Sequence, residues 1–143
     1  RYRYVNLGIA AATPRGLMVP NIKDAQDLGL RELALAISDL ARTAREGRTP
    51  PAALSGGTVS ISNVGVFGVD AGTPILNPGE AAILALGAVR SQPWEYEGGI
   101  ALRQVTTLSL SFDHRLVDGA EGAAFLRDIG DVLAEPAMVL AMD

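Results

Sequence analysis

The sequence contains one histidine, His114, which lies two positions after the most strand-like segment of the chain, residues 104–112. A side chain where a strand gives way to a helix can point into a cleft while its backbone is held in place. An imidazole has an unperturbed pKa of about 6.5, so it can remove a proton near neutral pH. The alternative is an ordinary loop histidine, because no metal ligand or nucleophile stands beside it.

Asp118 follows His114 by four positions and has a competing structural explanation. It stands where the N-cap of a helix is expected, and Glu121 follows three positions later, as in a capping box. The local pattern therefore favours a helix cap. Asp113 and Arg115 flank His114, and the sequence leaves open whether they form a solvated pair or internal hydrogen bonds.

Two serines lie in the alternating segment 58–63, where Ser60 and Ser62 fall on the same face of the predicted strand. Taken alone, both are typical polar strand residues. The glycines further along the chain do not form a GxGxxG pattern, so the sequence does not indicate a dinucleotide site.

The composition limits the chemistry that the chain can perform. Its 143 residues fit one domain, its net charge is −4, and it has no cysteine. Without cysteine there is no disulfide, thiolate zinc site or cysteine nucleophile, so any thiol must arrive on a substrate. We expect no nucleic-acid partner, because the chain has no basic run and no series of stacking aromatic residues. We also expect no metal site. We expect no membrane span, because no apolar run reaches about 20 residues.

The elements that must position these residues follow from hydrophobic periodicity and from Gly and Pro placement. We expect an ordered loop over residues 65–79 and a hairpin turn over residues 95–99. Pro20 should place its strand at a sheet edge or limit the pairing of that strand. Strands mixed with two helices predict an α/β two-layer sandwich, a mixed sheet with helices on one face. The predicted strands cover residues 2–12, 17–22, 58–63, 81–89 and 104–112, and the predicted helices cover residues 30–46 and 119–134.

Four segments together resemble one known family. Residues 113–119 (DHRLVDG) resemble the DHRxxDG motif of the dihydrolipoamide acyltransferase component of 2-oxo acid dehydrogenase complexes. Three further segments resemble stretches of that family in the same order: residues 12–20 (ATPRGLMVP), 57–65 (GTVSISNVG) and 74–84 (PILNPGEAAIL). The resemblance implies a chloramphenicol acetyltransferase-like fold. It also implies an enzyme that moves an acyl group between dihydrolipoamide and coenzyme A.

The resemblance assigns roles to three of the residues named above. His114 would be the general base that takes the thiol proton, and Ser62 would donate a hydrogen bond to the oxyanion. Asp118 would help to hold the active-site geometry through an arginine from an earlier part of the domain. Coenzyme A would be a substrate, and the acyl group would be branched-chain or acetyl. The alternative is a non-catalytic structural core subunit that organises the complex.

The resemblance also predicts the organisation of the protein. Residues 1–143 match only the later part of the family's catalytic domain. The lipoyl group would be carried on a domain absent from this chain, as would the peripheral subunit-binding domain. His114 and Ser62 would meet from different chains of a homotrimer within a larger core, which would work with dehydrogenase and dihydrolipoamide dehydrogenase components. The expected compartment is the cytoplasm, or the mitochondrial matrix in a eukaryote.

Overall fold

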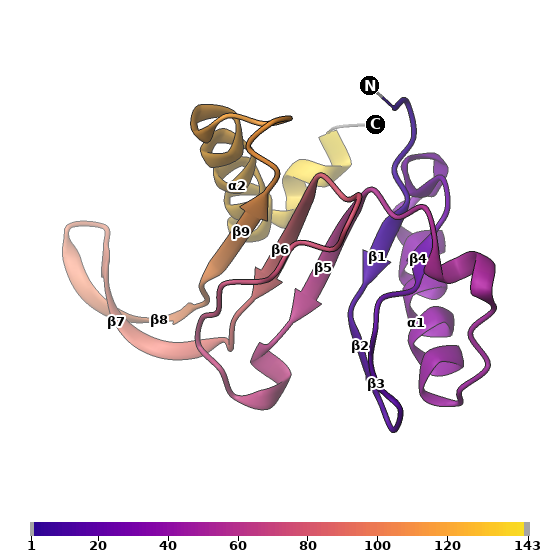
Figure 1. The fold of residues 1–143 in the computed structure, drawn as a ribbon. Coiled ribbons are helices and arrows are strands. Elements are labelled where there is room, and N and C mark those ends of the chain that lie inside the picture. The colour runs from indigo at the N-terminus through magenta and orange to yellow at the C-terminus, as the bar shows by residue number, and fades with distance from the viewer. Residues whose placement is uncertain (1, 142–143) are drawn as a thin grey trace.

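The computed structural model describes residues 2–141 and has nine strands and two α-helices in that range (Figure 1). The strands are β1 (Leu7–Ile9), β2 (Ala11–Thr13), β3 (Gly16–Met18), β4 (Asn21–Ile22), β5 (Val59–Asn63), β6 (Ala82–Leu86), β7 (Arg90–Tyr96), β8 (Gly99–Val105) and β9 (Leu108–Phe112). The α-helices are α1 (Leu30–Arg45) and α2 (Gly119–Ala134). Four short 3₁₀ helices complete the element order: η1 (Ala25–Asp27), η2 (Pro51–Leu54), η3 (Gly65–Phe67) and η4 (Pro136–Ala141).

Five strands form one mixed sheet in the order β4-β1-β5-β6-β9. The three central strands run parallel, and the two edge strands are antiparallel to their neighbours. Two separate hairpins, β2-β3 and β7-β8, extend from it. The mixed sheet with two helices confirms the predicted fold class.

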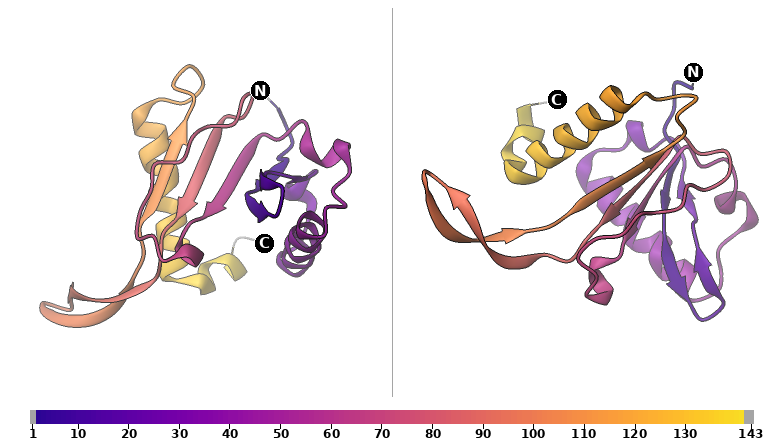
Figure 2. Two further views of the ribbon diagram at one scale, coloured as in Figure 1. Left: turned by 60° about the horizontal axis from the view of Figure 1, so that its bottom comes forward. Right: turned by 60° about the vertical axis from the view of Figure 1, so that its left-hand side comes forward.

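The two faces of this sheet differ in chemistry. On one face, α2 packs over β9. The ring of Phe112 lies against Gly122 so closely that a Cβ added to Gly122 would be 2.6 Å from the nearest ring carbon. Paired residues share a face, and the register therefore places four serines on the opposite face, which we call the serine face: Ser60, Ser62, Ser109 and Ser111. Figure 2 shows α2 on one side of the sheet only.

Both predicted helices are confirmed, and each begins where the sequence indicated. Along α1, side chains at helical spacing turn toward the protein, and Leu33, Ile37 and Leu40 are half-buried beside the fully buried Ala44. The helix packs against β2 and β4. In the part of the chain that the structure describes, no helix is both long enough and apolar enough to cross a membrane.

Four predicted strands were too long. The one predicted over residues 81–89 is present as β6 but ends at Leu86. Residues 2–12 contain only β1 and the start of β2, which belong to different sheets, and the segment 17–22 is split before β4. Pro20 at this split is fully buried, and β4 is an edge strand, as expected. The single strand predicted over residues 104–112 is wrong. It breaks at Thr106 and Thr107, where the chain leaves β7 and begins to pair with β6.

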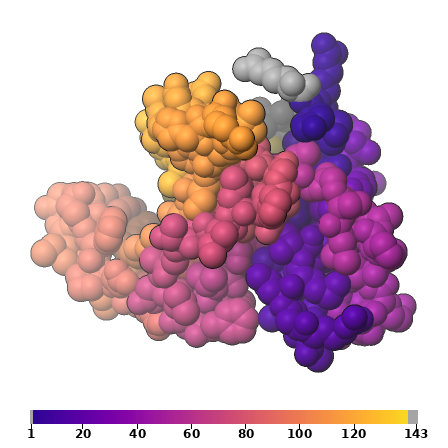
Figure 3. Space-filling view, in the orientation of Figure 1, coloured from indigo at the N-terminus to yellow at the C-terminus, as the bar shows by residue number. Residues whose placement is uncertain are grey.

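The hairpin of β7 and β8 projects from the body of the molecule (Figures 1 and 3). Its turn lies within the predicted range, and both Glu97 (φ 52°) and Gly98 (φ 79°) have left-handed backbone conformations. Two consecutive positive φ values match the strand twist of a tight hairpin. The hairpin carries exposed apolar side chains, among them Trp94, Ile100 and Leu102.

Candidate active site

His114 lies in the turn between β9 and α2, at the end of the sheet where β5 and β6 begin. Its backbone is anchored on both sides, because the Asp113 N–H donates to the Ala81 carbonyl and the Leu116 N–H donates to the Asp113 carbonyl. The imidazole is exposed, and its ring centroid is 5.7 Å from that of Phe112. The ring therefore sits on a fixed turn and is open to an approaching molecule.

Asp113 and Arg115 hold this turn from its outer side. The Arg115 Nε and Nη2 atoms donate to the two Asp113 carboxylate oxygens, the shortest contact being 2.6 Å, and the Arg115 backbone N–H donates to Oδ1. The side-chain and backbone hydrogen bonds from Arg115 lower the pKa of Asp113 to about 2. The same pairing raises the pKa of Arg115. The sequence left open a solvated pair or internal hydrogen bonds. The structure shows Asp113 and Arg115 as a bidentate ion pair in which the Arg115 side chain is exposed.

Asp118 caps α2, as its local sequence predicts. Its Oδ1 accepts a 2.8 Å hydrogen bond from the Glu121 N–H, and the Glu121 carboxylate accepts from the Asp118 N–H at 3.2 Å. This reciprocal pair is a complete capping box. Within residues 2–141, Asp118 forms no ion pair with an arginine. The predicted arginine contact therefore has no counterpart in the described chain.

Ser62 lies near the end of β5, on the serine face. It is half-buried, and no partner for its hydroxyl is found among residues 2–141. Two other hydroxyls of this face are engaged, because Ser60 Oγ accepts from Asn77 Nδ2 at 3.3 Å and Ser111 Oγ donates to the Pro74 carbonyl at 2.6 Å. The serine-face hydroxyl at position 62 can therefore donate to an added molecule without breaking a bond within the protein.

The loop over residues 64–79 covers the serine face and is fixed by Arg90. The Arg90 Nε atom donates to Asp70 at 2.5 Å, and its Nη2 atom donates to the Gly68 carbonyl at 2.8 Å. Sequence reasoning missed this anchor, because Asp70 and Arg90 are 20 residues apart and neither stands in a recognisable pattern. An acidic residue in a Gly-rich loop was the only local signal.

The structure does not bring Ser62 and His114 together within one chain. The register aligns Ser62 with Ala85 and Ser109, whereas His114 lies five residues beyond Ser109 at the other end of the sheet. From strand dimensions the two residues are about 17 Å apart along the strands and about 10 Å apart across them, or roughly 20 Å in total. One small substrate cannot contact both residues of the same chain at a single reacting atom.

The arrangement offers acid–base and hydrogen-bonding groups. Among residues 2–141 there is no group of three or more His, Cys, Asp or Glu side chains that could hold a metal ion. Such a site can move a proton at His114 and can stabilise negative charge at Ser62.

Known proteins show which family this arrangement belongs to. The family model for 2-oxoacid dehydrogenase acyltransferases (catalytic domain) matches residues 1–141. The chain is 49% identical over 138 residues to the dihydrolipoyllysine-residue acetyltransferase component of the acetoin cleaving system of Bacillus subtilis, with 96% of the chain covered. It is 42% identical over 137 residues to the succinyltransferase component of the 2-oxoglutarate dehydrogenase complex of Rickettsia felis, again with 96% covered. In both cases it spans 34% of the relative's length.

Two solved structures share the fold with a TM-score of 0.90, at 38% identity over 98% of the chain and 58% of theirs. One addresses the role of a serine, a histidine and an asparagine in the catalytic mechanism of Azotobacter vinelandii dihydrolipoamide acetyltransferase. The other is the cubic core of the pyruvate dehydrogenase multienzyme complex. The chain therefore belongs to the family of 2-oxoacid dehydrogenase acyltransferase catalytic domains.

Proposed function

We propose that the protein transfers an acyl group between a dihydrolipoyl thiol and coenzyme A, with His114 as the general base. One observation carries the proposal beyond family membership. The histidine studied in the Azotobacter acetyltransferase follows the serine by 52 positions and precedes the asparagine by four. Ser62, His114 and Asp118 have the same separations, with an aspartate in place of the asparagine, and this spacing supports the proposed roles of Ser62 and His114.

The chemistry follows from the two side chains. A free thiol with a pKa of about 8.5 is mostly protonated at neutral pH, so a base must take its proton for attack. The His114 imidazole accepts that proton, and a new sulfur–carbon bond forms as the thiolate attacks the thioester carbonyl. The Ser62 hydroxyl donates to the oxygen on which negative charge develops. The old sulfur–carbon bond then breaks, and the departing sulfur takes the proton back from His114.

The active site is proposed to form between two copies of the chain. The separation of roughly 20 Å between Ser62 and His114 within one copy supports this, because both must reach one thioester. The projecting hairpin supports it further, because Ile100 is 85% exposed and Leu102 is 73% exposed, as expected of side chains that pack on a neighbour. A homotrimer within a larger core agrees with the cubic assembly of one structural relative. The dehydrogenase components and the lipoyl domain are its proposed partners.

For the acyl group we favour acetyl over succinyl. The chain is more similar to the Bacillus acetyltransferase than to the Rickettsia succinyltransferase, at 49% against 42% identity. The positive charge of Arg115 beside His114 is neutralised by its pairing with Asp113, which also favours an acyl group without a carboxylate. A branched-chain acyl group is the other expectation from the sequence, and the ratio of kcat/KM for acetyl, isobutyryl and succinyl coenzyme A would rank the three.

The decisive test mixes two inactive variants of the whole protein, His114→Ala and Ser62→Ala, each defective in a different half of the site. Acetyl transfer from acetyl coenzyme A to dihydrolipoamide is measured for each variant alone and after they are dissociated together and reassembled. If each site uses one half from each of two copies, random assembly restores about a quarter of the sites.

The two inactive variants separate three outcomes. Recovery toward a quarter of native turnover supports a base and a donor on different chains. No recovery, although both variants assemble, would overturn the two-copy site. If the His114→Ala variant alone keeps near-native turnover, His114 is not the base and the structural-subunit alternative gains support. A Ser109→Ala variant on the same face serves as the matched control and should remain active.

A further inference from the structure

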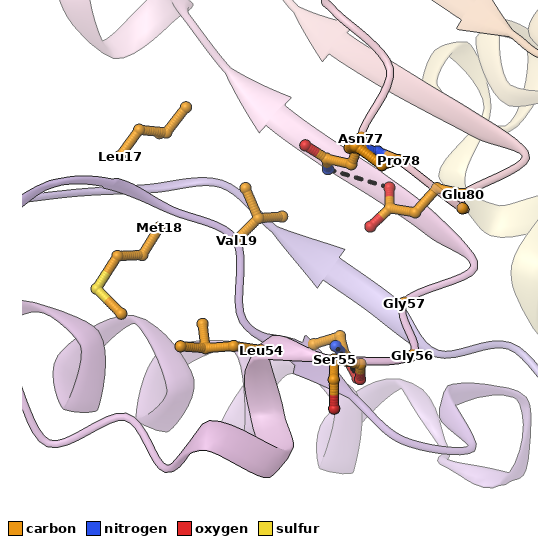
Figure 4. Close-up of a pocket in the computed structure, with 12 residues that line it drawn as sticks. Leu17, Met18, Val19, Leu54, Ser55, Gly56, Gly57, Asn77, Pro78 and Glu80 are labelled. Atoms are coloured by element: carbon orange, nitrogen blue, oxygen red, sulfur yellow. Dashed lines mark hydrogen bonds between the residues drawn. The ribbon is translucent and has the colours of Figure 1, made fainter.

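Glu80 is a buried carboxylate that the proposed acyl transfer does not use. It is 9% exposed and lies two positions before β6, on the wall of a cavity of about 550 Å³ (Figure 4). Its Oε2 atom accepts a 3.1 Å hydrogen bond from Asn77 Nδ2, which Figure 4 draws as a dashed line. Within residues 2–141, Glu80 forms no ion pair. A charged side chain is rarely buried without a compensating partner, and here that partner is the amide of Asn77.

The Asn77–Glu80 pair closes a turn that fits against the start of β5. The Glu80 N–H donates to the Asn77 carbonyl at 3.1 Å, so a backbone bond and a side-chain bond join the same two residues. The carboxylate lies beside Gly57, where an added Cβ would be 2.6 Å from Glu80 Oε1. Glycine at position 57 therefore leaves the space that the carboxylate fills between the starts of β5 and β6.

The backbone of Ala81 connects this turn to the turn that carries His114. Ala81 directly follows Glu80. Its N–H donates to the Thr58 carbonyl at 2.8 Å, and its carbonyl accepts from the Asp113 N–H at 2.9 Å. Asp113 in turn directly precedes His114. A single hydrogen bond therefore joins the residue after Glu80 to the residue before the proposed base.

We propose that Glu80 is a positioning residue for His114. Bonded to Asn77, the carboxylate fixes the Ala81 carbonyl, and this carbonyl fixes the start of the His114 turn. The inference rests on the acyl transfer proposed above, and it assigns Glu80 to the half of the site that supplies the base. A base must lie within hydrogen-bond reach of the proton it takes, and a misplacement of about 1 Å can cost about 10²-fold in rate.

The first measurement follows acetyl transfer by two variants of the whole protein at position 80. Glu80→Ala removes the acceptor for Asn77 and should lower kcat about tenfold or more. KM for acetyl coenzyme A should change little, because a misplaced base slows proton transfer rather than substrate binding. Glu80→Gln keeps an oxygen that accepts from Asn77, so its kcat should stay close to native. Native kcat in Glu80→Ala, or equal losses in the two variants, would overturn the proposal.

Asn21, on the wall of the same cavity, provides a matched control for stability alone. It is 5% exposed, and its Nδ2 atom donates to the carbonyls of Ala53 at 2.9 Å and Ser55 at 3.0 Å, whereas its Oδ1 atom is unpaired among the described residues. These bonds hold the connection before β5 and do not reach the His114 turn. Asn21→Ala should therefore lower the melting temperature while kcat stays near native. If Asn21→Ala and Glu80→Ala lose kcat equally, Glu80 supports only the fold and the proposal fails.

The second measurement assigns Glu80 to one half of the site by mixing variants. Ser62 pairs with Ala85, five positions beyond Glu80, so Glu80→Ala should leave the donor intact. After joint dissociation and reassembly with Ser62→Ala, about a quarter of the sites combine an intact donor with a well-placed base, and turnover should rise toward a quarter of native. Reassembly with His114→Ala should give no rise, because every base is then missing or misplaced. Any other pattern would overturn the assignment to the base half.

The native protein and one further mixture separate failure of this inference from failure of the proposed function. If the native protein transfers no acetyl group, both fail. If native turnover is present and only the mixture of Ser62→Ala with His114→Ala does not recover, the two-copy site fails. The kcat values of Glu80→Ala and Glu80→Gln then still decide the role of Glu80.

A variant of Asn77 tests the same bond if Glu80→Ala does not assemble. Asn77→Asp has nearly the same shape but replaces the donor with a second carboxylate, so it should lower kcat about tenfold or more. Adding Glu80→Gln to it restores the bond with donor and acceptor exchanged, and kcat should return toward native. Native kcat in Asn77→Asp, or a loss that Glu80→Gln does not reverse, would refute Glu80 as a positioning residue for His114.

Discussion

The two ends of the central sheet are built in different ways. At the end with His114, the side-chain contacts that shape the turn come from residues within a few positions, including the Asp113–Arg115 pair and the Asp118–Glu121 capping box. On the serine face, which carries Ser62 toward the other end, the covering loop is held by bonds that span 17 to 37 residues, such as those from Asn77, Arg90 and Ser111.

This difference indicates how the two halves of the proposed site are supported. The proposed base is exposed and rests on a locally determined turn, so its chemistry can be removed without much effect on folding. The proposed donor lies on a face where the hydroxyls of Ser60 and Ser111 are bound to a long-range loop, so function and stability are more closely coupled there. The predictions below separate these two effects, beginning with the largest.

Replacing His114 with Ala should give the largest loss of activity. A positioned general base contributes roughly 10²–10⁴-fold, so kcat for acetyl transfer should fall by that range. The melting temperature should change little, because the imidazole is exposed and forms no hydrogen bond that the structure records. Steady-state kinetics and a thermal melt on the same sample check both expectations. A melting temperature that falls in step with kcat would show that the turn is not locally supported.

Replacing Ser62 with Ala should lower kcat by about 10²–10³-fold, the usual cost of one lost oxyanion donor. KM should change little, because the hydroxyl acts mainly on charge that develops in the transition state. Ser60→Ala is the matched variant one step along the same face. It removes the acceptor of an Asn77 hydrogen bond and should cost about 1 kcal/mol of stability with little change in kcat. If Ser60→Ala has the larger effect on kcat, the assignment of the donor is wrong.

The structure around the His114 turn could be predicted from the sequence in detail. The capping box at Asp118, the limits of α2 and the α/β class all followed from spacing and periodicity over a few residues. The break at Thr106 and Thr107 could not be predicted in this way, because the segment has strand-forming residues throughout. What breaks it is the change of partner from β7 to β6, and this is a tertiary event.

The residues of the candidate site could be predicted from the sequence, but their positions relative to one another could not. The resemblance identified His114, Ser62 and Asp118, whereas periodicity alone gave no reason to prefer Ser62 over Ser60. Only the register shows that Ser60 Oγ is already bound and that Ser62 lies far from His114 in the same chain. The unpaired oxygen of Asn21 gives no signal in the sequence, because its environment is assembled from segments more than 30 residues apart.

Two variants of Asp118 can separate the stability that comes from its N-cap hydrogen bond from the stability that comes from its negative charge. Asp118→Ala removes the acceptor for the Glu121 N–H and should lower the free energy of unfolding by about 1 kcal/mol. Asp118→Asn keeps an acceptor at the N-cap and should lose only a fraction of that. We expect Asp118→Asn to keep most of its activity as well, since an asparagine has the same spacing in the Azotobacter acetyltransferase. Denaturant unfolding of both variants is the measurement, and equal losses would show that the negative charge matters more than the hydrogen bond.

The smallest expected effect is the pH dependence of the stability that the Asp113–Arg115 ion pair contributes. Hydrogen bonds from Arg115 lower the pKa of Asp113 to about 2, below the value of about 3.9 for an unfolded chain. A carboxyl whose pKa is lower in the folded state contributes stability above the unfolded pKa, and this contribution is lost as pH falls from about 4 through about 2. The pair should therefore remain intact between pH 5 and 8, so any change of kcat in that window does not come from Asp113. Carboxyl ¹³C NMR titration should find the low pKa in the native chain and a value near 3.9 in Arg115→Ala. If the two titration curves coincide, the ion pair seen beside His114 does not persist in solution.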